Sequence, residues 1–210
     1  MRYSEFANKF NNYPYFRSDS LRFFGKQYRT LQNQLKAWEK QGKIIRLRRE
    51  FYTLNDKDRR VGLSRPFIAN SIYPDSYISL EYAMSLAGLI PEMVSTLTCV
   101  SLHKRASFEN AYGLFTYRQI SPSIFFGFRK EKDEFGLSHL IAEPEKALLD
   151  FLFFAKVARP SRSFLEDSLR LQNLGTLAIS RLREFAKRFA MKKIELFCSI
   201  IIDMIREERA

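Results

Sequence analysis

The stretch YRTLQNQLKAWEKQGKIIRLRREFYTL, residues 28–54, carries the clearest structural pattern of the chain. Its apolar side chains recur at spacings of three, four and three residues, as one face of an α-helix requires; they are Tyr28, Leu31, Leu35 and Trp38. We therefore expect a helix over residues 26–41, ended by Gly42. Two runs rich in β-branched and aromatic residues follow at 43–47 and 51–54. Because only the basic turn Arg48-Arg49-Glu50 separates them, they predict a β-hairpin.

Two further helices are expected before this stretch. In residues 3–11, Phe6 and Phe10 stand four apart and share one helical face. Ser18 is a residue type that caps helix N-termini, and it precedes a second short helix over residues 18–24, ended by Gly25. An order of three helices and a basic hairpin is that of a winged helix-turn-helix. We predict this domain over residues 1–60.

The polar face of the third helix has a chemistry suited to duplex DNA. A helix fits the major groove, where arginine pairs with guanine and asparagine with adenine, and basic side chains neutralise phosphates. The candidate DNA-binding residues of the helix and the hairpin are Arg29, Thr30, Asn33, Lys36, Lys40, Lys43, Arg46, Arg48 and Arg49. The alternative is that this polar face is only solvated. Glu50 would repel phosphate unless it pairs with Arg48 or Arg49.

Positive charge is concentrated in the same part of the chain. The 210 residues have a net charge of +12 at pH 7. Residues 1–60 account for +9 of it, because they hold 15 Lys and Arg against 6 Asp and Glu. Such a basic protein favours polyanionic partners, with nucleic acid first among them. The polar run 55–60 is the expected hinge to a nearly neutral remainder.

Cysteine usage and hydropathy favour a reducing, cytoplasmic location. The two cysteines, Cys99 and Cys198, form no disulfide framework. The most apolar stretch, residues 194–205, includes two acidic residues and is too short to cross a bilayer, so we expect no membrane association. Its apolar stripe is Phe197, Ile201 and Ile205. We interpret this stripe as part of the core, with a dimer face as the alternative.

Residues 61–157 predict a second domain that mixes helices with an antiparallel sheet. Ser79 can cap a helix over residues 80–86, and Pro144 stands at the first position of a helix over 145–157. Strand-like runs lie at 96–102, 114–120, 124–128 and 137–141. Residues 158–210 predict three C-terminal helices packed on this domain. The expected fold class is therefore α+β.

Three strings of the sequence resemble one known family. They are GKIIRLRREFYTL (42–54), YISLEYAMSLAGLIPE (77–92) and IAEPEKALLDFLFF (141–154). Together they make residues 3–157 similar to the AbiEi-type antitoxins, the DNA-binding partners of abortive-infection type IV toxin–antitoxin systems. The resemblance implies a winged helix that binds operator DNA and represses its own operon. It also implies a second domain that counteracts a nucleotidyltransferase-like toxin encoded next door. One departure is Glu50, since family wings usually read Arg-x-Gly-x-Tyr.

The two downstream strings are expected to act mainly as scaffold. Lys146 and Asp150 stand four residues apart on one helical face, and we favour an ion pair between them over a paired-carboxylate active site. Cys99 and His103 lack the further ligands that a zinc site needs. The sequence has no P-loop, no G-x-G-x-x-G and no G-x-S-x-G motif. We therefore expect no enzymatic activity, no cofactor and no metal.

The sequence is compatible with three functions. The first is a DNA-binding repressor and antitoxin, for which an operator with inverted repeats and a homodimer are expected. The second is a protein-interaction module that neutralises a partner enzyme through residues 61–210, with little or no specific DNA binding. The third is an RNA-binding protein or nuclease. It is disfavoured because Tyr28 and Trp38, which could stack on bases, belong to the core stripe instead of the basic face.

Overall fold

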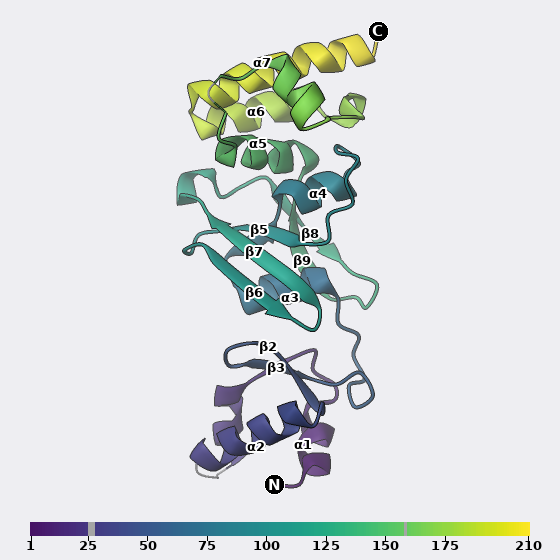
Figure 1. The fold of residues 1–210 in the computed structure, drawn as a ribbon, viewed down its shortest axis with the longest axis vertical. Coiled ribbons are helices and arrows are strands. Elements are labelled where there is room, and N and C mark those ends of the chain that lie inside the picture. The colour runs from purple at the N-terminus through teal and green to yellow at the C-terminus, as the bar shows by residue number, and fades with distance from the viewer. Residues whose placement is uncertain (25–27, 158) are drawn as a thin grey trace.

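The computed structural model describes residues 1–24, 28–157 and 159–210. It shows an elongated molecule with the N-terminal elements at one end, a six-stranded sheet in the middle and the last helices at the other end (Figure 1). The chain therefore runs along the long axis from its N-terminus to its C-terminus. The α+β class expected from the sequence is confirmed.

The N-terminal unit, residues 1–60, combines helices with a small antiparallel sheet. Its helices are α1 (Tyr3–Phe10), the 3₁₀ helix η1 (Ser18–Phe24) and α2 (Tyr28–Lys40). Its strands are β1 (Phe16–Arg17), β2 (Ile44–Arg48) and β3 (Phe51–Leu54), in the order β1-β3-β2. The helix α1, the helix α2 and the hairpin confirm the predicted elements. The second predicted helix forms as 3₁₀ turns, and β1 was not predicted.

A compact aromatic core holds this unit together. Leu31, Leu35 and Trp38 of the predicted stripe are buried, and the Trp38 ring lies 4.7 Å from that of Phe6 between centroids. These contacts confirm that one face of α2 packs inward. The predicted helix start at residues 26 and 27, the predicted stop at Gly25 and the side chain of Tyr28 lie outside the described part of the chain.

The central sheet has the strand order β6-β7-β5-β4-β9-β8. Its strands are β4 (Ser76–Ile78), β5 (Leu97–Ser101), β6 (Ala106–Asn110), β7 (Gly113–Gln119), β8 (Phe128–Lys132) and β9 (Ser138–Ala142). The predicted antiparallel pairing is found between β4 and β5, β6 and β7, and β8 and β9, but the sheet is mixed, because β4 pairs with β9 and β5 with β7 in parallel. Both parallel pairs join strands that have other elements between them in the chain, so local sequence patterns do not reveal them.

One predicted strand is also wrong. Residues 124–128 do not form a strand: η2 (Pro122–Ile124) is a 3₁₀ turn, and β8 begins only at Phe128. The proline at the start of the turn fixes a backbone angle and provides no N–H donor, which favours a turn over a ladder. The helix α3 (Arg65–Ile72) and the strands β4, β6 and β8 were not predicted.

Helices cover the sheet on both sides. The helix α3 contacts β4, β5 and β9 on the side that faces the N-terminal unit. The helices α4 (Leu80–Leu86) and α5 (Pro144–Phe154) pack together on the other side. Pro144 begins α5 as predicted.

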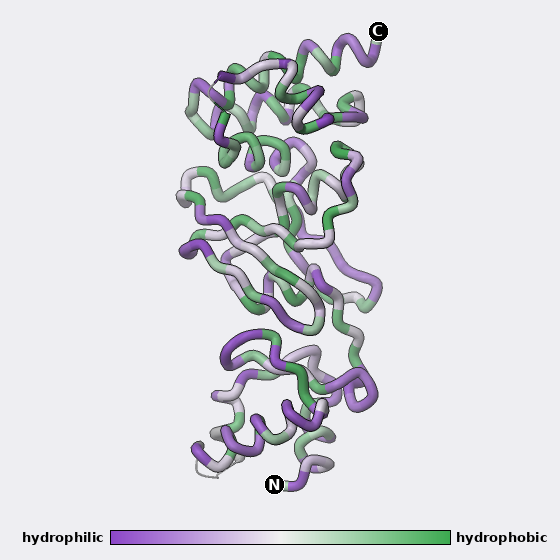
Figure 2. The backbone as a smooth tube through the Cα atoms, in the orientation of Figure 1, coloured by the Kyte–Doolittle hydropathy of each residue, from purple (hydrophilic) through white to green (hydrophobic). Residues whose placement is uncertain are grey.

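The C-terminal helices form a further layer on α5 (Figure 1). This layer contains the π-helical turn η3 (Phe164–Ser168), the 3₁₀ turn η4 (Leu174–Thr176), α6 (Ile179–Phe189) and α7 (Lys192–Glu208). The first of the three predicted helices is therefore only a short turn. Phe197, Ile201 and Ile205 are fully buried in the main core, which confirms the core interpretation of their stripe. Hydropathy along the backbone alternates between green and purple in both C-terminal helices, as amphipathic packing requires (Figure 2). Within the described ranges, no helix has the length and hydropathy of a membrane span.

Candidate nucleic-acid interface

The outer face of α2 displays most of the predicted DNA-binding residues. All of its predicted members are solvent-exposed; they are Arg29, Thr30, Asn33, Lys36 and Lys40. Their spacing keeps them on one side of the helix because three to four residues complete each turn. The opposite side is fixed by Leu31, Leu35 and Trp38, which are at most 7% exposed. A polar, basic face is thus mounted on a rigidly packed helix.

The N-terminus of the chain also fixes α2. Gln34 Nε2 donates a hydrogen bond to the carbonyl oxygen of Met1 over 3.2 Å. The ring centroids of Tyr3 and Trp38 lie 5.4 Å apart in an edge-to-face arrangement. Aromatic pairs of this geometry contribute beyond simple burial of area. The helix α1 therefore acts as a support for α2.

The basic residues of the hairpin do not all face the same way. Arg46 and Arg49 are exposed, whereas Arg48 is partly buried. The guanidinium carbon of Arg48 lies 4.5 Å from the ring centroid of Phe51, 5.6 Å from that of Phe108 and 6.0 Å from that of Tyr73. Two of these rings belong to the second unit.

Burial also affects the ionisation of Arg48. It lowers the pKa of the guanidinium, and the neighbouring Arg17 acts in the same direction. Its Nε is buried with no hydrogen-bond partner among the described residues. Arg48 therefore joins the two units, whereas Arg46 and Arg49 are exposed to solvent.

Lys43 is likewise separated from the α2 face. Its ammonium lies 4.9 Å from the ring centroid of Tyr3 on α1. Tyr3 Oη in turn lies 2.6 Å from Asp58 Oδ2 and 2.9 Å from the Lys43 carbonyl oxygen. Burial first, and then the hydrogen bond to Asp58, raise the pKa of Tyr3. The structure thus places Lys43 in a local network at the start of β2.

The turn of the hairpin has a left-handed residue at Glu50. Its φ angle is +69°, a conformation that favours glycine, and its carbonyl oxygen accepts a hydrogen bond from the Ser18 N–H over 2.9 Å. The turn therefore keeps the backbone geometry that glycine would allow, although its residue is glutamate. Glu50 forms no ion pair with any other described residue, so the pairing with Arg48 or Arg49 that would offset its repulsion of phosphate is absent there. Its carboxylate remains beside the exposed Arg49 in the turn.

One cation near the hairpin was not predicted. Arg17 lies on β1, and its guanidinium carbon is 5.2 Å from the Phe51 ring centroid. It is exposed and forms a 3.1 Å ion pair with Asp19. A two-residue strand has too few positions to show an alternating pattern, so the sequence provided no signal for its position beside the hairpin.

The segment expected to be a hinge is a structured connection. Arg59 has a side chain only 5% exposed, and its Nη1 donates to Thr53 Oγ1 over 2.9 Å and to Tyr112 Oη over 3.1 Å. Asn110 Nδ2 donates to the Leu47 carbonyl oxygen over 2.8 Å. These bonds join the hairpin to the second unit. The orientation of the α2 face relative to the sheet is therefore fixed by contacts as well as by chain connectivity.

Two of the family-like strings meet in a buried polar cluster. Tyr77 Oη and Ser79 Oγ donate hydrogen bonds to Asp150 Oδ2 over 2.9 and 2.8 Å. Lys146 forms an ion pair with Asp150, as the sequence predicted, and its Nζ lies 2.8 Å from Tyr77 Oη. All four side chains are fully buried. Burial raises the pKa of Asp150 and lowers that of Lys146, while the ion pair opposes both shifts. Because water does not reach the cluster, we assign it to the scaffold.

Cys99 and His103 lie in different environments. Cys99 is fully buried in β5, and burial raises the pKa of its thiol. His103 is exposed, with Nε2 3.2 Å from Asp75 Oδ2. In the described part of the chain, no group of three or more His, Cys, Asp or Glu side chains is arranged to hold a metal ion.

The chain matches no known protein-family model, and its sequence matches no curated protein. The resemblance to AbiEi-type antitoxins therefore rests on the quoted strings.

Proposed function

We propose that this protein is a DNA-binding transcriptional repressor whose residues 1–60 act as a winged helix-turn-helix. The observation that carries this proposal is the exposed face of α2, with Arg29, Asn33 and Lys36 on a helix that the core holds rigid. A helix of this kind can enter a major groove while an adjacent hairpin follows the backbone. Arg46 and Arg49 of the hairpin add two exposed cations to the same unit.

The side chains of α2 divide into two roles in this proposal. Arg29 and Asn33 read base edges, because their donors and acceptors match guanine and adenine respectively. Lys36, Lys40 and the hairpin arginines contact phosphates and fix the register on the duplex. Base readers should change which sequence is bound, whereas phosphate contacts should change affinity for all sequences alike.

The family resemblance extends the proposal to regulation. The protein would repress its own operon as a homodimer on inverted repeats. Its residues 61–210 would counteract a nucleotidyltransferase-like toxin encoded adjacently. The buried cluster of Tyr77, Ser79, Lys146 and Asp150 supports this part only as scaffold, because it joins two of the strings that carry the resemblance.

Selection of duplex fragments from the genome that encodes the protein tests the proposal. We expect one fragment, upstream of the protein's own gene, to bind with an affinity that falls steeply with salt. Lys36→Glu should weaken that binding while folding is retained. Lys130→Glu is the matched control, since Lys130 is an exposed cation on the far edge strand β8 and the change in charge is the same. Equal, weak binding to all fragments, or an unchanged affinity in Lys36→Glu, would refute the proposed face.

A second candidate, a protein-interaction module, is favoured by one surface feature. Met93 is 97% exposed and Leu86 is 63% exposed, and both line a hollow with Tyr82 and Val94. Exposed apolar side chains that gather in one place are typical of protein contacts. Co-expression of the full chain with the product of the adjacent gene tests this candidate. Met93→Glu should abolish a stable complex and leave DNA affinity unchanged; a complex that survives the change would exclude this surface.

A further inference from the structure

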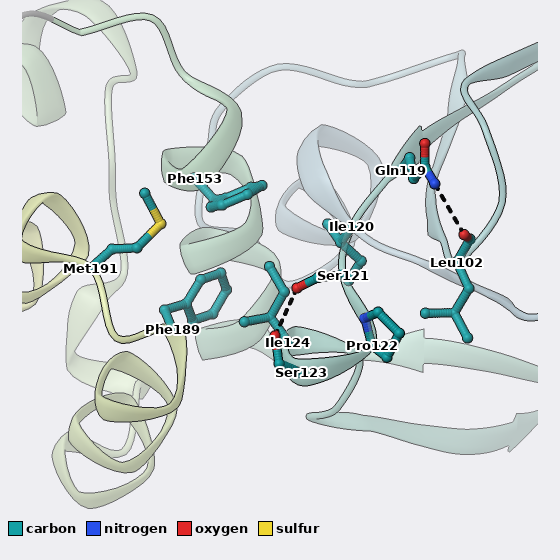
Figure 3. A pocket seen from close by; sticks show the side chains of 10 residues that line it. All are labelled: Leu102, Gln119, Ile120, Ser121, Pro122, Ser123, Ile124, Phe153, Phe189 and Met191. Carbon is teal, nitrogen blue, oxygen red and sulfur yellow. Dashed lines mark hydrogen bonds between the residues drawn. The ribbon is translucent and has the colours of Figure 1, made fainter.

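A hollow of about 490 Å³ lies between the ends of β5 and β7 and the C-terminal helices (Figure 3). Phe153 of α5, Phe189 of α6 and Met191 form one wall of it, with Ile124 beside Phe189, and Pro122 and Leu102 lie on the other side. The ring centroids of Phe153 and Phe189 are 5.9 Å apart. The hydroxyls of Ser121 and Ser123 lie 2.7 Å apart at its rim. The wall is therefore aromatic and apolar, and the rim can form hydrogen bonds.

A second hollow of about 410 Å³ adjoins the first. Gln119 at the end of β7 lines both, and Phe154 of the second directly follows Phe153 of the first. The other residues of the second hollow are all basic: Arg105, Arg118 and Lys156. We call the two hollows together the two-part cleft. Each part lies within the range of about 300–1,000 Å³ usual for small-molecule sites.

The basic part of the cleft holds charges that the protein itself does not neutralise. Neither hollow is lined by Asp or Glu, and none of Arg105, Arg118 and Lys156 forms an ion pair with a described residue. The guanidinium carbon of Arg118 lies 5.2 Å from the ring centroid of Phe154, which restrains it at the wall. Three neighbouring cations without carboxylate partners favour a ligand with more than one negative charge.

Hydrogen bonds from α7 fix the end of the helix that carries Phe153. Lys193 Nζ donates hydrogen bonds to the carbonyl oxygens of Phe153 and Ala155, over 3.3 and 2.5 Å. A cation at a helix C-terminus stabilises the last turn, so the end of α5 is anchored to α7. Gln119 Nε2 donates to the Leu102 carbonyl oxygen over 3.3 Å, which leaves Gln119 Oε1 available to a ligand (Figure 3).

We propose that the two-part cleft binds a nucleoside diphosphate. The base would pack against Phe153 and Phe189, and the phosphates would contact Arg105, Arg118 and Lys156. Ser121, Ser123 and Gln119 would bond the ribose or the polar edge of the base. A fatty acid would leave two of the three cations unused, and inorganic phosphate would leave the aromatic wall empty. The proposal does not depend on DNA binding, since α2 lies at the other end of the molecule (Figure 1).

Calorimetric titration of the full chain with ADP, CDP, GDP and UDP tests the proposal. We expect at least one of them to bind with a Kd below about 1 mM. Adenosine, lacking phosphates, and pyrophosphate, lacking a base, should each bind at least about tenfold more weakly than the best diphosphate, because each loses one class of contact. No diphosphate binding at about 1 mM would overturn the proposal. Pyrophosphate binding as tight as that of the best diphosphate would also overturn it, because the site would then recognise only an anion.

Two variants locate the binding. Arg118→Gln should weaken it about tenfold or more, since a charge-assisted hydrogen bond is lost. Gln119→Glu should weaken it too, because a carboxylate would then stand between the two hollows. Both side chains are exposed, so both variants should fold. Lys130→Gln on β8 is the matched control and should bind as the natural protein does. An equal loss in the control would overturn the cleft assignment, as would a short single-stranded oligonucleotide that binds about a hundredfold tighter than any diphosphate.

Discussion

Two adjacent arginines of the hairpin should respond in opposite ways to the same substitution. Arg48 lies against Phe51, Phe108 and Tyr73, whereas Arg49 is exposed. We expect Arg48→Ala to destabilise the protein without removing a phosphate contact. We expect Arg49→Ala to remove a phosphate contact without destabilising the protein.

The contacts set the size of each effect. A cation over an aromatic ring contributes about 0.5–1 kcal/mol when it is not deeply buried, so three rings give a gross value of about 1.5–3 kcal/mol. Desolvation of the guanidinium, which lowers its pKa, and its unpaired Nε oppose this gain. We therefore expect Arg48→Ala to lower the free energy of unfolding by about 1–2 kcal/mol. A chain of this size loses about 2–4 °C in Tm for each kcal/mol.

The assay pairs thermal unfolding with DNA affinity measured over a series of salt concentrations. Arg49→Ala should reduce the slope of log affinity against log salt by about 0.9, the value for one phosphate contact. Arg48→Ala should leave that slope unchanged, and Arg48→Met should recover part of the lost stability because its stem still packs on the rings. If Arg48→Ala reduced the slope and left Tm unchanged, the hairpin would face DNA with Arg48, and the contact between the units would be wrong.

Three further predictions concern the turn, the buried cluster and a buried histidine. Glu50→Gly removes both the left-handed strain and the carboxylate, so it should raise DNA affinity and increase the free energy of unfolding by up to about 1 kcal/mol. Glu50→Gln removes only the charge and should raise DNA affinity alone. If both variants were equally stable, Glu50 would not be strained. Lys146→Ala leaves Asp150 without its ion-pair partner in the core, so denaturant unfolding should show a free energy of unfolding that is lower by about 3–5 kcal/mol. A decrease below about 1 kcal/mol would refute the assignment of the cluster to the scaffold. Burial lowers the pKa of His139 below its usual 6.5 in the folded protein. As the pH falls below 6.5, the unfolded chain therefore binds a proton at this histidine more readily than the folded chain, and the free energy of unfolding should decrease. His139→Gln should flatten this pH dependence; an unchanged profile would show that other groups cause it.

The sequence was most informative where one local pattern decided the structure. The stripe of α2 and the position of Pro144 each determine a helix within one stretch of chain. The sequence also contains a local signal for α3, since Ser64 caps this helix and Pro66 stands in its first turn. The parallel pairs β4–β9 and β5–β7 carried none, because pairing between distant strands depends on the packing of the whole sheet.

Arg48 shows why the candidate interface was only partly predictable. Strict alternation would put Arg46 and Arg48 on the same face of β2. The register of β2 against β3 shifts between these two residues, as in a β-bulge, and a bulge redirects the side chains that follow it. Arg46 consequently remains exposed, while Arg48 turns toward the second unit. The helix face needed no such correction because helical spacing is insensitive to distant contacts.

The number of unpaired, exposed cations on the interface limits how steeply the DNA affinity of one protein copy can depend on salt. Lys43 lies over Tyr3, Arg48 lies between the units and Arg17 is paired with Asp19. Of the exposed cations of the proposed interface, Lys36, Lys40, Arg46 and Arg49 contact phosphates, because Arg29 reads a base edge. Four phosphate contacts give a salt slope no steeper than about −3.6, and two copies on an inverted repeat give up to about −7.2.

The salt slope, measured together with the number of protein copies on each duplex, therefore shows whether one copy or a dimer binds the DNA. A slope between about −4 and −7 with two copies per duplex would support the homodimer on inverted repeats. The same slope with one copy per duplex would mean that cations outside these four contact the backbone. The α2 face would then be only part of the DNA-binding surface, because its own charges cannot release that many counterions.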